Sequence, residues 1–201
     1  PELELTVVAC RGWRREAGCD ATGLPWVAPS PNMPSLDSAG LYPGLCLVEA
    51  TTLSEGRGTT RPFHLVGAPW VDGSRLVQEL RARDLPGVAF RAAVFQPTFH
   101  KHANKVCHGV EIHLTDRSAL RPMALGLSIL QALHDLDPVR FGWRQEAYEF
   151  VADVAALDLL TGSPDARELV DSGSALEPLF ADWQREVDEF TSGLGDGVLY
   201  R

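Results

Sequence analysis

The chain has 201 residues, of which 45% are hydrophobic and 22% charged, and its formal net charge is −9 at pH 7. This composition is typical of a globular protein that is long enough to bury one sizeable core or two small ones. No apolar run approaches the roughly 18 residues of a membrane span, and the acidic charge is spread along the predicted helices, with no basic stripe that would bind nucleic acid.

Two short apolar runs, residues 5–10 (LTVVAC) and 45–48 (LCLV), are typical of strands covered on both faces, as in a parallel sheet packed between helices. Residues 11–43 lie between them and contain five prolines, four glycines and two tryptophans, with a short helix expected over residues 35–41. A segment this long and irregular indicates a lid or a binding loop. Two strands do not complete a sheet, so we expect their neighbours upstream, in a longer polypeptide of which this chain is a part.

The pattern from residue 69 onward predicts a self-contained α+β unit. Asp72 is the expected N-cap of a helix that ends before Pro86-Gly87. Alternating apolar residues predict one strand over residues 88–94 and a second over residues 109–114, with Glu111 and His113 on the polar face of the second.

Helices are expected to follow these strands. Asp116 is the expected cap of the first of them, and Asp137-Pro138 and Ser163-Pro164 each place a capping side chain before a proline at the first helical position. Residues 174–177 (SALE) form a capping box. It opens a last helix whose inward face is expected to comprise Leu176, Leu179, Phe180, Trp183, Val187 and Phe190.

The segment VEATTLSEGRGTTRPF, residues 48–63, places two carboxylates, two arginines, four threonines and two glycines at the end of an apolar run. In open α/β sheets, ligands bind beyond the carboxyl ends of the strands. Gly56 and Gly58 would let the backbone approach a ligand, and Arg57 can contact a carboxylate through two N–H groups. The alternative is an ion-pair network among Glu49, Glu55, Arg57 and Arg61 at a domain junction, and the sequence leaves both interpretations open.

The residues of this segment bear on two enzyme chemistries, phosphate binding and glycoside hydrolysis. A phosphate-binding loop is disfavoured because EGRG lacks the lysine and the helix of a P-loop. Glu49 and Glu55 are compatible with the carboxyl separations of a retaining glycosidase, roughly 5 Å, or of an inverting one, about 6.5–9.5 Å. Their spacing along the chain does not decide between these two.

A second polar cluster, FHKHANKVCH, covers residues 99–108. His100, His102, Cys107 and His108 raise the question of zinc, but HxH followed by a distant CH is not a recognised zinc spacing. Hydrogen bonding within the loop and one or two ligand contacts, for example from Lys101 and His102, are the preferred interpretation. We expect neither a metal nor a cofactor.

The four cysteines show no CxxC spacing. Cys10 and Cys46 lie in apolar runs and are expected to be buried thiols. A Cys10–Cys19 disulfide is the alternative.

Six ordered blocks carry a resemblance that runs nearly end to end. They are PSPNMPSLDSAGLYPG (29–44), LSEGRGTTRPF (53–63), GAPW (67–70), FQPTFHKH (95–102), CHGVEIH (107–113) and DLLTGS (158–163). In these blocks the chain resembles the bacterial NamZ family of peptidoglycan exo-β-N-acetylmuramidases. Small departures are Ala50 and Thr52, where relatives commonly have glycine and asparagine, and His100, where serine is frequent.

The resemblance implies a glycoside hydrolase of cell-wall turnover that releases N-acetylmuramic acid from the non-reducing ends of peptidoglycan fragments. It also implies a cleft between a Rossmann-like N-terminal domain and a smaller C-terminal domain. Residues 1–66 would then be the end of the Rossmann-like domain, and residues 67–201 the α+β C-terminal domain. The family's upstream block with the PEHG motif, whose glutamate is a proposed catalytic residue, is not in this sequence.

On this basis Glu55 is the candidate catalytic carboxylate of this chain, with its catalytic partner expected upstream. Residues expected to line the sugar cleft are Glu49, Arg57, Thr59 and Thr60, joined by Lys101 and His102 from the second domain, with Arg57 or Lys101 holding the lactyl carboxylate of the muramic acid.

The expected partners are a peptidoglycan-derived sugar and the upstream part of the same polypeptide, without nucleic acid and without a membrane span. No signal peptide is visible, and a periplasmic or secreted location is the expectation that the resemblance implies. Two other classes of function stay open: a non-catalytic carbohydrate-binding or interaction module, and a metal-dependent hydrolase.

Overall fold

The computed structural model describes residues 3–195 and 198–200. It divides into two compact units, one made of Pro1–Val27 with Ala181–Arg201 and one of Ala28–Phe180. In the first unit a 3₁₀-helix, η1, covers Cys19–Thr22, and the backbone N–H of Cys10 donates to the Tyr200 hydroxyl at 2.7 Å.

The second unit contains a three-stranded antiparallel sheet with the strand order β1-β3-β2. The strands are β1 (Leu65–Ala68), β2 (Val88–Phe95) and β3 (Cys107–Leu114). Leu65 of β1 and Arg91 of β2 both pair with Glu111 of the central strand, so these three residues form one row across the sheet. Because side chains alternate along a strand, Leu65, Arg91 and Glu111 share one face.

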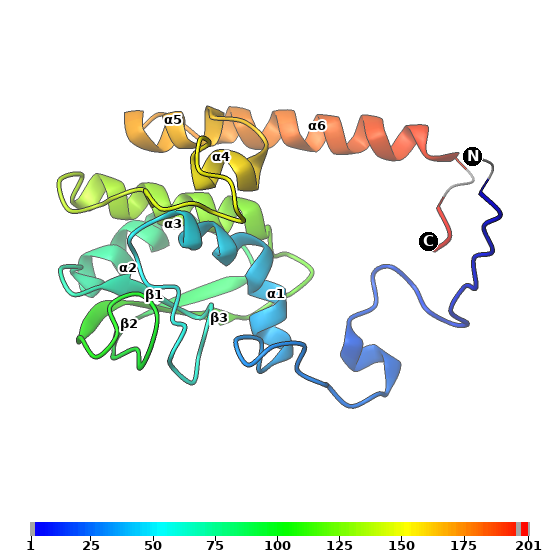
Figure 1. The fold of residues 1–201 in the computed structure, drawn as a ribbon, viewed down its shortest axis with the longest axis horizontal. Helices are drawn as coiled ribbons and strands as arrows, with labels where there is room; N and C mark the ends of the chain where they lie inside the picture. The colour runs from blue at the N-terminus through cyan, green and yellow to red at the C-terminus, as the bar shows by residue number, and fades with distance from the viewer. Residues whose placement is uncertain (1–2, 196–197, 201) are drawn as a thin grey trace. The chain divides into compact units, whose positions relative to one another are not determined.

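Helices cover the sheet in layers (Figure 1). The helix α2 (Gly73–Ala82) packs on β2 and β3, and α3 (Pro122–Leu136) packs on α2 and on α1 (Leu36–Leu45). The 3₁₀-helix η2 (Cys46–Ala50) continues α1, and the short helices α4 (Ala156–Thr161) and α5 (Asp165–Ser172) pack on η2 and α3 respectively. The last helix, α6, covers Glu177–Gly193.

The core of the second unit lies among these helices and the helix-facing side of the sheet, with Leu45, Leu76, Ile112 and Leu130 fully buried. Two glycines permit the close crossing of α1 and α3. A Cβ atom at Gly44 would lie 1.8 Å from the carbonyl oxygen of Pro122, and one at Gly126 would lie 2.2 Å from that of Gly44. Any side chain there would separate the two helices.

Several predicted elements are confirmed. The helix near residues 35–41 is α1, and Ser35 caps it by accepting from Ser38 N. Asp72 caps α2 by accepting from the backbone N–H groups of Ser74 and Arg75. The two predicted strands are β2 and β3, and the mixed α/β character is confirmed.

Both predicted N-terminal strands are wrong. Residues 45–48 are helical and lie at the junction of α1 and η2. The prediction failed because a short buried helix shows the same continuous apolar run as a buried strand. Residues 5–10 have no regular structure, and Leu5, Val7 and Val8 are exposed; no strand among the described residues pairs with this segment. The strand β1 was not predicted, since its four residues LVGA show no alternation.

The predicted helix starts at Asp116 and Asp137 are also wrong. The Asp116 carboxylate accepts from the backbone N–H groups of Ser118 and Ala119 in a turn, and α3 begins at Pro122. Asp137 caps a turn over residues 138–140 in the same way. The proline predicted at the start of a helix after Ser163 is the N-cap of α5.

On α6, the predicted inward face holds at its start, where Leu176 and Leu179 are buried. It is wrong further along, because Val187 and Phe190 are exposed.

All four cysteines lie in the described ranges and are free, so the Cys10–Cys19 disulfide is wrong. Cys10 is exposed and Cys46 is half-buried, contrary to the expectation of two buried thiols, whereas Cys107 is buried. No helix in the described part of the chain is long and apolar enough to cross a membrane.

Candidate functional site

The predicted site segment runs from the end of η2 into β1 and is tied at both ends. Ser54 N and Gly67 N each donate to the other residue's carbonyl oxygen, at 2.8 and 3.1 Å. Between Ser54 and the start of β1 the loop turns at Gly58, where φ is +79° and a Cβ atom would lie 2.7 Å from Phe99 N. The carbonyl oxygen of Gly58 accepts from both N and Oγ1 of Thr98, each at 2.9 Å. The loop is therefore held directly against the second polar cluster.

Glu55 is the centre of a buried charge cluster, with no exposed surface of its own. Lys101 Nζ donates to Glu55 Oε2 at 3.1 Å. Arg57 Nε and His100 Nδ1 lie 3.1 and 3.2 Å from Oε1. Neither contact at Oε1 has hydrogen-bond geometry among the described groups, so these two are close contacts and not directional bonds. The carboxylate thus holds three basic side chains in place.

Glu49 is the second carboxylate of this cluster. It pairs with Arg57 Nη2 and accepts a long hydrogen bond, 3.4 Å, from the Tyr148 hydroxyl. Burial together with the charge of Glu49 raises the pKa of Tyr148 to about 12 and that of the Cys46 thiol to about 11. Burial alone would lower the pKa of Arg57, but its hydrogen bond to Glu49 and the charges of both carboxylates raise it. Arg57 therefore stays a cation.

Lys101 joins the two halves of the cluster. Its Nζ also donates to the carbonyl oxygens of Val48 and Glu49, at 3.0 and 3.4 Å. Burial lowers the pKa of Lys101, against the opposing effect of the Glu55 charge. The neighbouring His102 donates through Nε2 to the carbonyl oxygen of Thr52 at 2.8 Å, and burial lowers its pKa as well.

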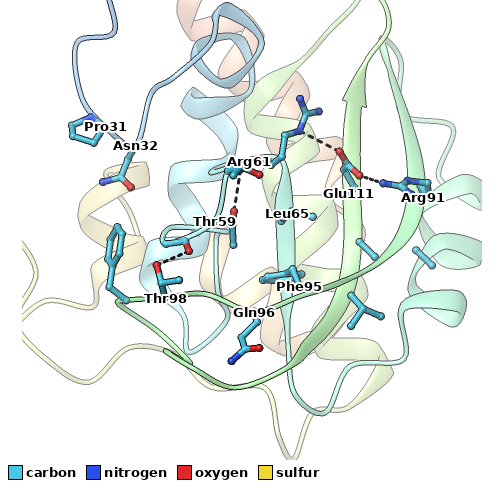
Figure 2. A pocket seen from close by; sticks show the side chains of 16 residues that line it. Pro31, Asn32, Thr59, Arg61, Leu65, Arg91, Phe95, Gln96, Thr98 and Glu111 are labelled. Carbon is cyan, nitrogen blue, oxygen red and sulfur yellow. Dashed lines mark hydrogen bonds and ion pairs between the residues drawn. The ribbon is translucent and has the colours of Figure 1, made fainter.

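A pocket of about 770 Å³ opens beside this cluster, on the sheet face that carries the row of Leu65, Arg91 and Glu111 (Figure 2). Leu65 and Phe95 supply apolar surface, and Thr59 and Thr60 come from the predicted site loop. Asn32 comes from the irregular segment before α1. Volumes of this size accommodate small organic ligands.

Charged groups line one part of this pocket. Glu111, which is buried, pairs with Arg91 Nη2 and lies 3.2 Å from Arg61 Nε. Burial would raise the pKa of Glu111, but its hydrogen bond to Arg91 and the neighbouring charges lower it. Beside Arg61, the buried His64 donates through Nδ1 to the carbonyl oxygen of Ile112 at 3.0 Å, and burial lowers its pKa.

The structure therefore separates the predicted site residues into two groups. Glu49, Glu55, Arg57 and Lys101 form the buried cluster, as in the ion-pair interpretation, with His102 adjacent to it. Thr59 and Thr60 line the pocket instead. Arg61 was expected in the network with Glu49 and Glu55, but it pairs with Glu111 from β3.

Sequence reasoning missed several residues that the structure places at these sites. His100 contacts Glu55, and Tyr148 reaches Glu49 from 99 positions away. Arg91 and Glu111 were assigned only to strands. Their opposite charges on the two predicted strands were a usable signal, since such pairs face each other across antiparallel neighbours. No comparable signal exists for Tyr148.

Among residues 3–195 and 198–200, no group of three or more His, Cys, Asp or Glu side chains is placed to hold a metal ion. His100 and His102 are each directed to protein groups, Glu55 and the Thr52 carbonyl.

The fold and the site define a mixed α/β protein with a small antiparallel sheet, a buried carboxylate–cation cluster and an adjacent polar pocket. The chain belongs to the exo-β-N-acetylmuramidase NamZ family: the C-terminal family model matches residues 40–200 and the N-terminal model matches residues 1–37.

A curated relative, the peptidoglycan β-N-acetylmuramidase NamZ of Bacillus subtilis (strain 168), is 40% identical over 199 residues, or 99% of this chain. The chain spans 46% of the length of that relative. Two crystal structures of DUF1343 family proteins from Bacteroides fragilis NCTC 9343 are similar. The match to the first has a TM-score of 0.80 at 29% sequence identity, and it covers 94% of this chain and 49% of the Bacteroides chain. The match to the second has a TM-score of 0.62 at 27% sequence identity, and it covers 87% of this chain and 44% of the Bacteroides chain.

Proposed function

We propose that this chain is part of an exo-acting glycoside hydrolase that releases N-acetylmuramic acid from the non-reducing ends of peptidoglycan fragments during cell-wall turnover. Family membership and the name of the Bacillus subtilis relative support this proposal. The observation in the structure that supports it most is the carboxylate Glu55, held by three basic groups directly behind a loop that lines a polar pocket.

In this proposal Glu55 is the carboxylate that this chain contributes to the reaction. Glycoside hydrolysis needs one acid to protonate the leaving oxygen and a second group to stabilise the oxocarbenium-like transition state or to activate water. We place the second group on the remainder of the complete protein, in a Rossmann-like domain of which residues 1–66 are the end. The expected location is periplasmic or secreted.

Glu55 has no exposed surface in this structure, so contact with a sugar requires a neighbour to move. His100 is the most exposed of its three basic neighbours, at 39% against 25% for Arg57 and 16% for Lys101. Its backbone also has a positive φ of 67°, a strained conformation for a residue other than glycine. We therefore propose that the route from the substrate to Glu55 passes the His100 side chain.

The experiment uses the complete gene product with Glu55→Gln and a chromogenic β-N-acetylmuraminide. We expect kcat to fall by at least about 100-fold, the range for loss of a group that transfers a proton. Glu146→Gln is the matched control, because Glu146 is highly exposed. Turnover by Glu55→Gln equal to that of the control removes Glu55 from the mechanism. Urea unfolding of both variants separates a catalytic loss from a loss of folded protein.

One observation favours a second function, a non-catalytic carbohydrate-binding module. Glu55 is closed off from solvent, whereas the neighbouring pocket is open, which fits binding better than chemistry within this chain alone. Titrating the 201-residue chain and the complete gene product with N-acetylmuramic acid, and assaying both for turnover, tells the two functions apart. Binding without turnover by both proteins would favour the module.

A further inference from the structure

Two arginines in the pocket share a single carboxylate. Among the described side chains that line it, Arg61 and Arg91 are the cations and Glu111 is the carboxylate. Glu111 contacts both of them, through Arg61 Nε at 3.2 Å and through Arg91 Nη2. With histidines counted as neutral, two positive charges against one negative leave this group with a net charge of +1.

The buried cluster has no such surplus. There Arg57 and Lys101 supply two positive charges, and Glu49 and Glu55 supply two negative ones. Lys101 Nζ is in addition directed to two backbone carbonyl oxygens. A ligand carboxylate that approached Arg57 or Lys101 would compete with two resident carboxylates, whereas one that approached Arg61 and Arg91 would complete a charge balance.

The arginines of the pocket are also accessible. The side chains of Arg91 and Arg61 are 67% and 41% exposed, whereas that of Glu111 is 10% exposed. Each guanidinium carries five N–H donors in a planar fork. Glu111 accepts a hydrogen bond from Arg91 and holds Arg61 by an ion-pair contact that lacks hydrogen-bond geometry, so free donors remain on both guanidinium groups for a planar anion such as a carboxylate.

The strand register and the loop place Arg61 and Arg91 beside apolar side chains and hydroxyl groups. Arg91 lies opposite Glu111 on β3, and the same side of the sheet carries Leu65 and Phe95. Thr60 adds a hydroxyl group on the loop just before Arg61, whereas the Thr59 hydroxyl donates to the Gly56 carbonyl oxygen and accepts from Arg61 N and so holds the loop in shape. A ligand that fits has one carboxylate, several hydroxyl groups and an apolar face, and this combination describes an acidic sugar.

We propose that Arg61 and Arg91, oriented by Glu111, recognise the carboxylate of an acidic amino sugar and make the site selective for it over the neutral sugar. This inference rests on the proposed function, because it assigns the carboxylate of the same substrate to two specific residues. Arg61 and Arg91 are specificity-determining residues here, and they take no part in bond cleavage.

The test measures binding of N-acetylmuramic acid and of its methyl ester to the complete gene product by isothermal titration calorimetry. The ester has nearly the same size and no charge. We expect the wild type to bind the acid more tightly, and Arg91→Gln and Arg61→Gln each to reduce that preference roughly tenfold or more, the effect of losing a hydrogen bond to a charged group. Arg91→Lys should restore part of it, and Arg75→Gln, at an exposed arginine of α2, should leave it unchanged.

Several results would overturn the inference. For the wild type, these results are equal affinity for the acid and the ester, or no binding of either. For the two glutamine variants, they are an unchanged preference in both, or an equal loss of affinity for the acid and the ester, which indicates a structural role. Arg57→Gln in the same assay tests the competing assignment, and a loss of preference confined to that variant also overturns ours. If the preference behaves as expected while the protein leaves the muraminide intact, the proposed function fails and this inference stands.

Discussion

Lys101 Nζ lies 3.1 Å from Glu55 Oε2 and 3.0 Å from the carbonyl oxygen of Val48, so one buried ammonium group connects the second polar cluster to the start and to the middle of the predicted site segment. A lysine in this position cannot be replaced by an apolar side chain without leaving unpaired acceptors in the interior. The contacts of Lys101 therefore stabilise the folded loop and also balance the charge of Glu55.

Lys101→Met tests this connection. Removing one partner of a buried pair leaves Glu55 less compensated and two carbonyl oxygens with one donor fewer, so we expect the free energy of unfolding to fall by about 3 kcal/mol. Urea denaturation followed by tryptophan fluorescence measures it. Lys105→Met, at an exposed lysine four positions away, should change the free energy by less than about 0.5 kcal/mol. Equal effects of the two substitutions would contradict a structural role for Lys101.

Gly58→Ala tests the close contact between the two site loops. Alanine would carry the cost of a positive φ, about 1–2 kcal/mol, and would also place Cβ 2.7 Å from Phe99 N. Gly162→Ala separates the two causes, because φ is +82° there and no atom lies within 4 Å of the added Cβ. We expect thermal unfolding to show a loss at Gly58 at least twice that at Gly162. Equal losses would mean that the loops move apart without cost.

The sequence predicted which charged residues lie together better than it predicted the fold around them, and their roles in a site stay a prediction. The clustering of Glu49, Glu55 and Arg57 follows from a short loop between two anchored ends, so local sequence was sufficient. Lys101 was correctly grouped with them because its block was recognised. The pairing of Arg61 with Glu111 depends on the register of β1 on β3, and β1 is too short to show a period.

The errors in the fold have a common physical origin. The run LCLV at residues 45–48 is fully apolar because the junction of α1 and η2 lies in the core, and an apolar run carries no period that separates helix from strand. At Asp116 and Asp137 the side chain does accept backbone N–H groups as predicted, but an aspartate turn and a helix cap use the same bonds. The predicted boundary between two domains at residue 66 stays a prediction.

The low pKa of His64 predicts a pH dependence of stability. Burial lowers the pKa below 6.5 in the folded state, with Arg61 adding to this effect and the Ile112 carbonyl, Asp37 and Glu111 opposing it. Between the folded pKa and 6.5 the unfolded chain binds more protons, so the free energy of unfolding should fall as the pH is lowered from about 6.5 towards 5. The half-buried His102 acts in the same direction, and the carboxylates with lowered pKa, such as Glu111, act only below about 4.5.

Urea denaturation at intervals between pH 5 and pH 7.5 measures this dependence. His64→Asn keeps a donor for the Ile112 carbonyl without a titrating ring, so its free energy of unfolding should vary less with pH than that of the wild type. His108→Asn, at an exposed histidine, controls for the substitution itself. An identical pH dependence in wild type and His64→Asn would show that the ring is not the group responsible.

The Cys46 thiol reports on the electrostatics of the cluster from outside it. Burial, with the charge of Glu49 as the second cause, raises its pKa to about 11, and the thiolate is the species that alkylating reagents attack. The rate of iodoacetamide labelling at Cys46, followed by peptide mass spectrometry, should therefore rise about tenfold per pH unit from pH 8 to pH 10. Glu49→Gln should increase the rate at pH 8, because one of the two causes is removed while the half-buried position is kept. A labelling rate that levels off near pH 9 in the wild type, or that is unaffected by Glu49→Gln, would mean that the Glu49 carboxylate does not act on Cys46 as its place in the structure requires.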